Sequence, residues 1–519
     1  MKLTSHISQF IRQTVLALGL AVLITPATRA ETNSLPASVV EVLVTVQKFD
    51  SHFPWKKARP ESRTGYGIVI TDGQLITTED LVRNATLIEI QPPGGASKTT
   101  ARVIEADPRI NAALLAAPTT GYVPVQWGAP LRTGAKIQLV QFDAAGQQQS
   151  GEGRITAIQI AQLPNAPLSI LTFQALTDLK LERVGSPAYH EGKLAGLIME
   201  YDDATQTSLV LPTAILKRFV DDVSAPPYRG IAIAGMTWAP LVAPAARKFY
   251  GLTDDRQGVL VLRTIPGSGA AAVLQSGDVI LKWDGYAVDS QGYYTDPDFG
   301  RLVLIHQISG RRHPGDIITI TRWRNKKSEE VQLKLDAYSD SKSLVPLNIE
   351  GEQAEYLVEG GFIFRELSAD YLLAYGAQWM VRSNPRLVDL YLTRAQAPTK
   401  PGERVIILTG VLPDPINVGY QEIRDELVTQ LNNKPVTSMK DVFAIRDQDE
   451  GITRIRLKSL GLDLVMDKAM LPEANRRIAM LYGIPKREHR KPTPAVGPLR
   501  SNSVTTGNQR LSAVQGAAN

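Results

Sequence analysis

Short runs of apolar residues, each closed by turn-forming residues, dominate the first part of the chain. Residues 67–70, 87–90 and 137–142 are runs of this kind, and glycine, proline and aspartate lie just beyond the first two. Short runs bounded by such residues are typical of β-strands joined by turns. The pattern therefore predicts a mainly β region over residues 31–224, folded as a barrel or a sandwich.

A helical period replaces the β pattern at the end of this region. Apolar residues recur at the spacing of one helix face over residues 211–223, with a proline early in the stretch. They are Ile215, Leu216, Phe219 and Val220. The Ala-Pro-Pro sequence at 225–227 then predicts a linker to a second domain.

The first 30 residues have the pattern of an export signal. Lys2 and Arg12 precede a ten-residue apolar run at 15–24, and small residues lead up to Ala30. Ten apolar residues are too few to cross a bilayer, which needs about 20. We expect residues 1–30 to be a signal peptide cleaved near Ala30, which implies a periplasmic protein; an uncleaved anchor is the alternative.

Charge is distributed unevenly along the 519 residues. The chain has 57 Lys and Arg against 52 Asp and Glu, a formal net charge of +5. Residues 1–30 contribute +3 and residues 486–519 contribute +5, which leaves −3 for everything between. A nearly neutral body does not favour a nucleic-acid groove. Residues 486–519 are also rich in proline, serine, glycine and asparagine, which predicts a disordered basic tail.

The chain has no cysteine. This excludes disulfides, zinc ribbons, iron–sulfur clusters and cysteine nucleophiles. No paired metal ligands stand out among the six histidines. We expect neither a metal nor a cofactor.

Three segments carry a family resemblance by their order along the chain. They are GYGIVITDGQLIT at 65–77, ADPRINAALL at 106–115, and GSP at 185–187 with GKLAGL at 192–197. Together they resemble the protease domain of the HtrA/Deg serine proteases. The resemblance implies a trypsin-like double β-barrel over residues 31–224.

The catalytic positions of that family are occupied by other residues here. Carried over residue by residue, the catalytic His falls on Asp80, the Asp on Asn111 and the Ser on Val184. A triad needs a hydroxyl that an imidazole deprotonates and a carboxylate that orients the imidazole. We therefore expect a catalytically degenerate member, a pseudoprotease. An active serine endopeptidase with a non-standard site, such as Ser186 with His190, is the alternative.

Residues 228–340 resemble a PDZ domain of the same family. YRGIAI at 228–233 is followed in the family's order by GVLV at 258–261, GDVILKWDG at 277–285 and PGD at 314–316. The resemblance implies capture of a chain end, with backbone N–H groups around Gly230 cradling a carboxylate. The expected peptide-binding residues are Tyr228, Arg229, Gly230, Ile231 and Ile233, with Leu302 and Ile305.

Two further features bear on this expected groove. Leu302 and Ile305 lie in the stretch 299–308, whose apolar spacing predicts a helix along one side of the groove. The alternative is that another part of the same chain fills the groove.

Residues 352–485 suggest a second PDZ-like unit. GGFIF at 360–364 is similar to a carboxylate-binding loop and strand, and TQLNNKPV at 429–436 parallels KWDGYAV at 282–288 as an internal repeat. In the Deg subgroup that this segment resembles, the second PDZ domain packs on the first and serves assembly. The fold class expected is thus mainly β, a trypsin-like double β-barrel followed by two PDZ-like α+β domains.

These features together predict an exported binding protein. It would bind unfolded or C-terminal protein segments as a chaperone, scaffold or regulator in envelope protein quality control. The resemblance also implies a trimer-based homo-oligomer and an active Deg protease as a partner, with no nucleic acid bound by the folded body.

Overall fold

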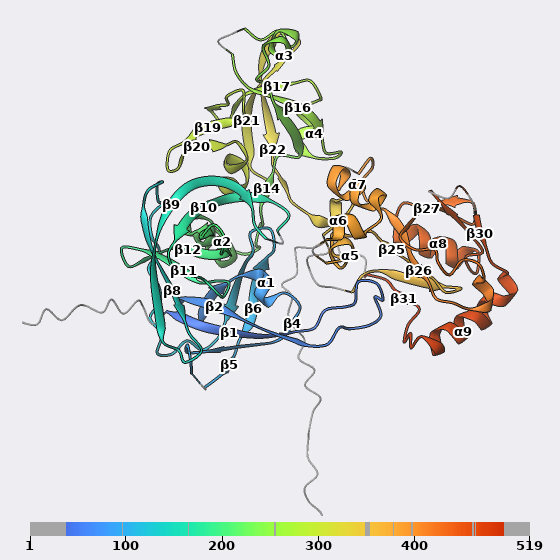
Figure 1. Cartoon of the computed structure of the whole chain (residues 1–519). Helices are drawn as coiled ribbons and strands as arrows, with labels where there is room; N and C mark the ends of the chain where they lie inside the picture. Colours follow the sequence, from blue (N-terminus) through green and yellow to red (C-terminus); the bar gives the residue numbers. More distant parts are fainter. Residues whose placement is uncertain are drawn as a thin grey trace, which may run out of the picture. The chain divides into compact units, whose positions relative to one another are not determined.

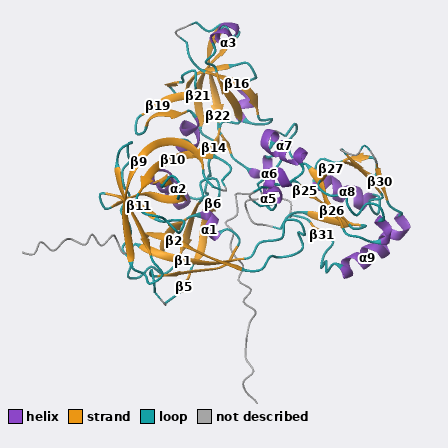
Figure 2. Ribbon diagram, viewed as in Figure 1, coloured by secondary structure: helices purple, strands orange, loops and turns teal. Residues whose placement is uncertain are grey.

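A computed structural model describes residues 38–95, 97–164, 166–253, 256–347, 353–376, 378–395, 398–458, 461 and 463–491. The expected signal peptide and the residues after Lys491 lie outside these ranges. Strands are the main elements, as Figures 1 and 2 show. The mainly β class expected from the sequence is confirmed. Within the described ranges, no helix has the length and apolar character needed to cross a membrane.

The first sheet has seven strands in the order β5-β4-β1-β2-β3-β7-β6. The strands are β1 (Val39–Val46), β2 (Glu61–Thr71), β3 (Gln74–Thr77), β4 (Ala85–Gln91), β5 (Thr99–Thr100), β6 (Arg102–Asp107) and β7 (Ala112–Ala116), with the short helix α1 (Glu79–Val82) after β3. Val40, Val42 and Val44 of β1 are buried in its core, because alternate residues of a strand face the same side. This core fixes α1, which carries Asp80, and β7, which begins directly after Asn111.

The second sheet is a closed barrel in the order β10-β13-β12-β11-β8-β9. Its elements are β8 (Lys136–Phe142), β9 (Gln148–Gln162), β10 (Ser169–Thr177), β11 (Pro187–His190), β12 (Lys193–Asp202) and β13 (Thr207–Pro212), followed by α2 (Thr213–Ser224). The four apolar residues that predicted a helix are the buried face of α2. Val184 lies in the loop between β10 and β11.

Residues 228–340, which the sequence analysis expects to form the first PDZ-like unit and which keep that name below, contain a sheet of order β15-β16-β17-β21-β22, with β18 paired to β17, and the two-stranded sheets β14-β23 and β19-β20. Its elements are β14 (Ala232–Ile233), β15 (Met236–Pro240), α3 (Pro244–Phe249), β16 (Val259–Thr264), α4 (Gly269–Val273), β17 (Val279–Trp283), β18 (Tyr286–Ala287), β19 (Tyr293–Asp296), β20 (Gly300–Val303), the π-helix η1 (His306–Gly310), β21 (Ile317–Arg324), β22 (Lys327–Lys334), β23 (Asp336–Ala337) and the 3₁₀ turn η2 (Asp340–Lys342).

The helix predicted over residues 299–308 is wrong. β20 pairs with β19 there, with Leu302 opposite Tyr294, and only η1 is helical. Gly300 has a φ of +80°, which a helix does not allow. Asp296 also accepts backbone N–H bonds from Asp298 and Phe299 and so forms the turn between the two strands.

The second PDZ-like unit contains a sheet of order β30-β29-β27-β26-β25-β24-β31, with β28 paired to β27. Its elements are β24 (Tyr356–Glu359), β25 (Phe362–Glu366), α5 (Ala369–Leu373), α6 (Trp379–Arg382), α7 (Pro385–Arg394), β26 (Ile406–Val411), η3 (Pro415–Asn417), β27 (Glu426–Leu431), β28 (Lys434–Pro435), α8 (Met439–Gln448), β29 (Arg454–Leu457), β30 (Asp463–Val465), η4 (Lys468–Met470), α9 (Leu471–Leu481) and β31 (Glu488–His489).

The prediction that a disordered basic tail begins at Lys486 is also wrong. Residues 488–489 form β31 and pair with β24, and the Val358 N–H donates to the Arg487 carbonyl at 2.7 Å. Arg446 and Glu488 form an ion pair that holds this strand in place. Composition predicts a tail because the segment is polar, but the strand is held by backbone hydrogen bonds and ion pairs.

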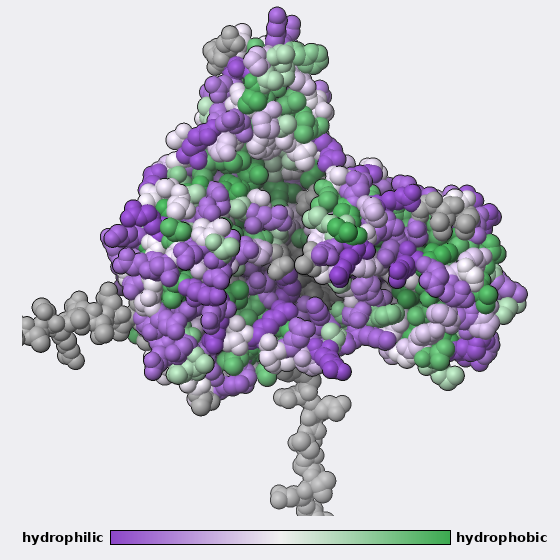
Figure 3. All heavy atoms as spheres, in the orientation of Figure 1, coloured by the Kyte–Doolittle hydropathy of each residue, from purple (hydrophilic) through white to green (hydrophobic). Residues whose placement is uncertain are grey.

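In Figure 3, hydrophilic side chains cover much of the visible face, with smaller hydrophobic areas between them.

Candidate functional site

The positions that the family resemblance assigns to His and Asp lie next to each other. Asp80 is in α1, and its backbone N–H donates to Asn111 Oδ1 at 2.9 Å. Asn111 is 1% exposed and adopts a φ of +51° just before β7. Arg63 Nη1 donates to the Asp80 carbonyl at 2.9 Å. Asp80 Oδ1 and Asn111 Nδ2 are buried, and neither has a hydrogen-bond partner among the described residues. The fold thus brings these two positions together but places no imidazole between them.

The nucleophile position is filled by a packed apolar side chain. A Cβ atom added to Gly65 would lie 3.3 Å from Val184 Cγ2 and 2.7 Å from Leu81 Cδ2. The Tyr66 N–H donates to the Val184 carbonyl at 3.2 Å. Val184 therefore packs against β2 and the α1 segment and supplies no group that can attack a carbonyl.

The alternative pair, Ser186 and His190, is separated by its hydrogen bonds. Ser186 is fully buried, and its Oγ donates to the Arg183 carbonyl at 2.9 Å. His190 Nδ1 lies 2.6 Å from the Lys136 carbonyl oxygen. A serine and its base must be within hydrogen-bond reach of each other. This pair does not meet that condition.

The turn before Val184 is held by charged side chains. Arg183 Nη1 donates to Glu41 Oε1 at 2.5 Å, and its guanidinium lies 5.5 Å from the Tyr66 ring centre. Burial lowers the pKa of Arg183, but the hydrogen bonds and charges of Glu41 and Tyr66 together outweigh it, and the pKa is raised. Glu182 donates its N–H to Gln141 Oε1 at 3.2 Å.

A cavity of about 510 Å³ adjoins Asp80. Its charged lining residues are Lys48, Asp50, Arg63, Asp80, Arg83, Arg365 and Asp370. Space for a bound group therefore remains beside Asp80.

The first predicted carboxylate loop, residues 229–231, is covered by an arginine that the sequence interpretation missed. A Cβ on Gly230 would lie 2.7 Å from Arg109 Nη1, and this nitrogen donates to the Tyr338 carbonyl at 3.3 Å. Asp107 holds the arginine through a 2.6 Å bond to its Nε and also accepts from the Tyr228 hydroxyl. Burial, with the Asp107 charge adding to it, raises the pKa of Tyr228 well above its ordinary value.

The rest of the expected groove is closed in part. Ile231 is 5% exposed and adjoins a cavity of only about 10 Å³, shared with Ile110 and Phe219. Ile233 pairs with Asp336 in the β14-β23 sheet. Leu302 is buried in β20, whereas Ile233 and Ile305, just before η1, stay partly exposed. Arg109 covers Gly230 from another part of the chain, whereas Ile233 lines a cavity of about 190 Å³.

The remaining predicted residue of the loop, Arg229, points to the barrel side. Its Nη2 donates to Asp222 Oδ1 of α2 at 2.8 Å. No pattern in the sequence indicates that Arg109 covers Gly230, because the two residues are more than 100 positions apart.

The second predicted carboxylate loop, Gly360-Gly361-Phe362, is covered from within its own unit. The Gly360 N–H donates to Asn475 Oδ1 of α9 at 2.8 Å, and a Cβ on Gly360 would collide with Met466 Sδ. Asn475 Nδ2 donates to the buried Glu359 Oε2 at 3.1 Å, and Arg487 donates to the same oxygen at 2.8 Å.

Comparison with known proteins agrees with this architecture. A PDZ domain family model matches residues 345–490. Protease Do-like 2, a chloroplastic protein of Arabidopsis thaliana, is 25% identical over 458 residues, which are 86% of this chain and 74% of the relative. The putative mitochondrial protease Do-like 3 of the same plant is 23% identical and covers 83% of this chain and 75% of its own length. The chain is a homologue of the Deg/HtrA proteases.

Among solved structures, the HtrA-type protease AlgW with a tripeptide aligns with this Deg/HtrA homologue at 20% identity and a TM-score of 0.48. The match covers 59% of this chain and 95% of AlgW.

Proposed function

We propose that this Deg/HtrA homologue binds extended or C-terminal segments of other proteins without cleaving them. Its role would be that of a chaperone, scaffold or regulator in envelope protein quality control. The observation that carries the proposal is the state of the three triad positions, Asp80, Asn111 and Val184.

Peptide hydrolysis by this fold needs a nucleophile and a base that activates it. Val184 has no reactive group, and its side chain packs against the core cluster that contains Leu81. Asp80 offers a carboxylate where the family resemblance puts an imidazole, and Asn111 binds the Asp80 backbone rather than a base. The chemistry of acyl transfer is therefore missing at each of its three positions.

The PDZ match over residues 345–490 supports the binding half of the proposal. PDZ domains take up extended peptides by adding a strand to a sheet edge and holding a terminal carboxylate on backbone N–H groups. In this chain Arg109 has to move away before the first loop can do so.

Residues 1–30 support export, because they have the pattern of a cleaved signal peptide. We propose a periplasmic location on this basis. A trimer-based assembly and an active Deg protease as a partner belong to the same proposal and rest on the family resemblance.

A labelling experiment tests the loss of catalysis. The purified full chain is incubated with a fluorophosphonate probe and, separately, with casein, beside a matched variant with Asp80→His, Asn111→Asp and Val184→Ser. We expect no labelling and no casein fragments from the natural chain. Labelling of the natural chain, together with cleavage that the probe blocks, would overturn the proposal in favour of an active serine endopeptidase.

A further inference from the structure

The loop that joins β1 to β2 contacts the second PDZ-like unit through two aromatic side chains. Trp55 of this loop is 7% exposed and packs in the hydrophobic core of that unit. The ring centre of His52 lies 5.3 Å from that of Tyr371 and 5.0 Å from that of Tyr375. Residues 47–58, called the aromatic loop below, thus place two rings, three positions apart, against the same unit.

The second unit also binds the backbone of the loop directly before each ring. Arg365, which is 1% exposed, donates from Nη1 to the carbonyl of Ser51, the residue before the first ring. Gln353 donates from Nε2 to the carbonyl of Pro54, the residue before the second ring, at 2.7 Å. The unit therefore contacts a carbonyl followed by a ring twice, at a spacing of three residues.

The aromatic loop keeps its shape through its own hydrogen bonds. Asp50 Oδ1 accepts the N–H groups of His52 and Phe53 at 2.8 and 2.9 Å. The Asp50 N–H donates to the Lys56 carbonyl at 2.9 Å. A turn centred on an aspartate in this way forms from local groups alone. The loop can therefore keep this shape when it is away from the second unit.

The surface that receives the loop is likewise held from within its own unit. Asp425 accepts the hydroxyl groups of both Tyr371 and Tyr375, and Arg365 Nη2 donates to Ser368 Oγ at 2.8 Å. Binding costs less when both partners are shaped in advance. Because loop and surface are shaped independently, the contact can open without unfolding either of them, and another segment can take the place of the loop.

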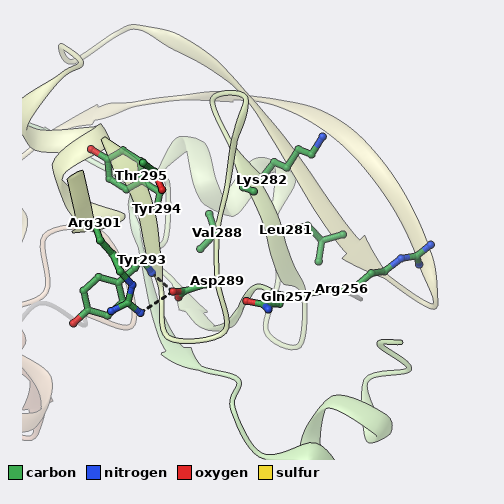
Figure 4. A pocket seen from close by; sticks show the side chains of 11 residues that line it. Arg256, Gln257, Leu281, Lys282, Val288, Asp289, Tyr293, Tyr294, Thr295 and Arg301 are labelled. Carbon is green, nitrogen blue, oxygen red and sulfur yellow. Dashed lines mark hydrogen bonds and ion pairs between the residues drawn. The ribbon is translucent and has the colours of Figure 1, made fainter. Parts of the chain in front are cut away.

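The cavity of about 430 Å³ in the first PDZ-like unit differs from this surface (Figure 4). Its Asp289 Oδ2 accepts Arg301 Nη2 at 2.8 Å, and its Arg256 lies 4.4 Å from the centre of the Trp323 ring. These charged groups contact neighbours in the same unit and so do not define a ligand. The surface on the second unit, in contrast, already holds a chain segment of known composition.

We propose that the second PDZ-like unit binds protein segments that carry two aromatic residues three positions apart, and that the aromatic loop covers this surface as an internal ligand. The two hydrogen bonds to the loop are made to backbone carbonyls, which every segment has, so the rings set the pattern that is bound. The inference rests on the proposed binding of protein segments and adds the residue pattern of those segments.

Fluorescence anisotropy with the full chain tests the proposal. The probe is a fluorescein-labelled peptide with the sequence of residues 47–58. The surface is uncovered in a double variant that combines His52→Ala with Trp55→Ala. We expect saturable binding to the double variant and at least about tenfold weaker binding to the natural chain, because the tethered loop competes at a high effective concentration.

Changes in the peptide test the pattern of its rings. Tyrosine in place of its histidine should keep the affinity within about threefold, because an aromatic contact with the two tyrosines of the surface remains. Alanine in place of both its histidine and its tryptophan should weaken binding at least about tenfold. A shift of the tryptophan by one position should weaken binding by a similar factor, because the second ring then no longer follows the bound carbonyl.

Two further variants of the chain serve as controls. Phe53→Ala removes a ring of the same loop that is 37% exposed, and it should leave peptide binding within about twofold of the natural chain. Asp50→Ala removes the acceptor that shapes the loop and should strengthen peptide binding about threefold. The second variant keeps both rings, so the test does not depend on the fold of the double variant.

Three results would overturn the proposal. They are equal peptide binding by the natural chain and the double variant, equal binding of the alanine peptide, and assembly of the natural chain that the double variant loses in sedimentation. The last result would assign the surface to the loop of a second copy. Binding of reduced casein to the natural chain is measured in parallel. If casein binds and the peptide does not, this inference fails while the proposed function stands.

Discussion

The two loops that the sequence analysis expects to hold a peptide carboxylate, one in each PDZ-like unit, are covered differently. Arg109, more than 100 positions away in the sequence, lies over Gly230. At Gly360 the cover comes from the same unit, with Asn475 bonded to the loop N–H and β31 paired along β24. Arg109 is held by Asp107 and by the Tyr338 carbonyl, whereas the cover at Gly360 is a buried amide network with a paired strand. The first loop is therefore covered by one side chain from outside its unit, and the second loop by the fold of its own unit.

Acid should separate the two units most strongly. Burial lowers the pKa of His306 in the first unit to about 4, against a smaller opposing effect of Asp296, while Arg311, Arg218 and Asp298 also act on it. The folded unit then binds fewer protons than the unfolded chain between about pH 6.5 and pH 4. Its free energy of unfolding is therefore highest above about pH 6.5. It falls by about 3 kcal/mol as the pH drops from about 6.5 to about 4.

The second unit should respond in the opposite direction. Burial raises the pKa of Glu366, with Arg404 opposing it, so the folded unit binds more protons than the unfolded chain as the pH falls toward 4.5. Hydrogen exchange of β21 and β25 at several pH values, corrected for intrinsic rates, measures both trends. His306→Leu should flatten the pH dependence of the first unit's stability, and Glu366→Gln that of the second unit's. Parallel pH trends in the two units would contradict the assignment of these trends to His306 and Glu366.

Removal of the buried carboxylate at the second loop should cost stability without opening a site. Glu359→Ala leaves Asn475 and Arg487 without their shared acceptor and should lower the free energy of unfolding of this unit by about 2 kcal/mol. Urea unfolding followed by hydrogen exchange of β24 measures the loss. Glu450→Ala, at a surface side chain that is 83% exposed, is the matched control and should change stability by less than about 0.5 kcal/mol. Equal effects of the two variants would mean that the network does not hold the loop.

Removal of the cover at the first loop should instead create binding. Arg109→Ala clears the space above Gly230 and should raise the affinity for peptides with a free C-terminal carboxylate about tenfold, or about 1.4 kcal/mol. Peptides with an amidated C-terminus should show no gain in affinity. Asn475→Ala at the second loop should give no such gain, because β31 still pairs with β24. Calorimetric titration distinguishes these outcomes, and a gain from Asn475→Ala alone would reverse the comparison.

The smallest effect is expected at the former nucleophile position. Val184→Ser removes apolar contacts beside Leu81 and should cost about 1 kcal/mol, with no hydrolysis of casein. Val123→Ser, at an apolar side chain that is 58% exposed, should change stability by less than about 0.5 kcal/mol. Thermal unfolding and gel analysis give the two readouts. Casein fragments from Val184→Ser would mean that Asp80 can act as a base.

Local patterns in the sequence predict much of this fold. The apolar period of α2 and the strand-and-turn rhythm of β2 and β3 come from short-range spacing, which the chain itself displays. At residues 299–308 the apolar spacing fits both a helix and a strand. Leu302 and Leu304 are two positions apart, as on one face of a strand, and Leu302 and Ile305 are three positions apart, as on one face of a helix. The turn bonds of Asp296 and the positive φ of Gly300 decide for the strand.

The covers of the two loops could not be predicted in this way. Arg109 and Asn475 act on glycines more than 100 positions away, and no spacing rule links such residues. The strand at 488–489 follows from pairing with β24 rather than from its own polar composition. The assignment of the triad positions to Asp80, Asn111 and Val184, in contrast, comes from the sequence alone, through the family resemblance of the segments around them.

The central claim is that this Deg/HtrA homologue binds protein segments and leaves them whole. Its most direct test combines binding and cleavage in one sample, in which the purified chain is incubated with reduced, unfolded casein. Sedimentation then measures complex formation, and mass spectrometry measures the intact mass of the casein. The account predicts a stable complex and an unchanged casein mass after a long incubation. Casein fragments that disappear when a fluorophosphonate is added, or the absence of any complex, would contradict it.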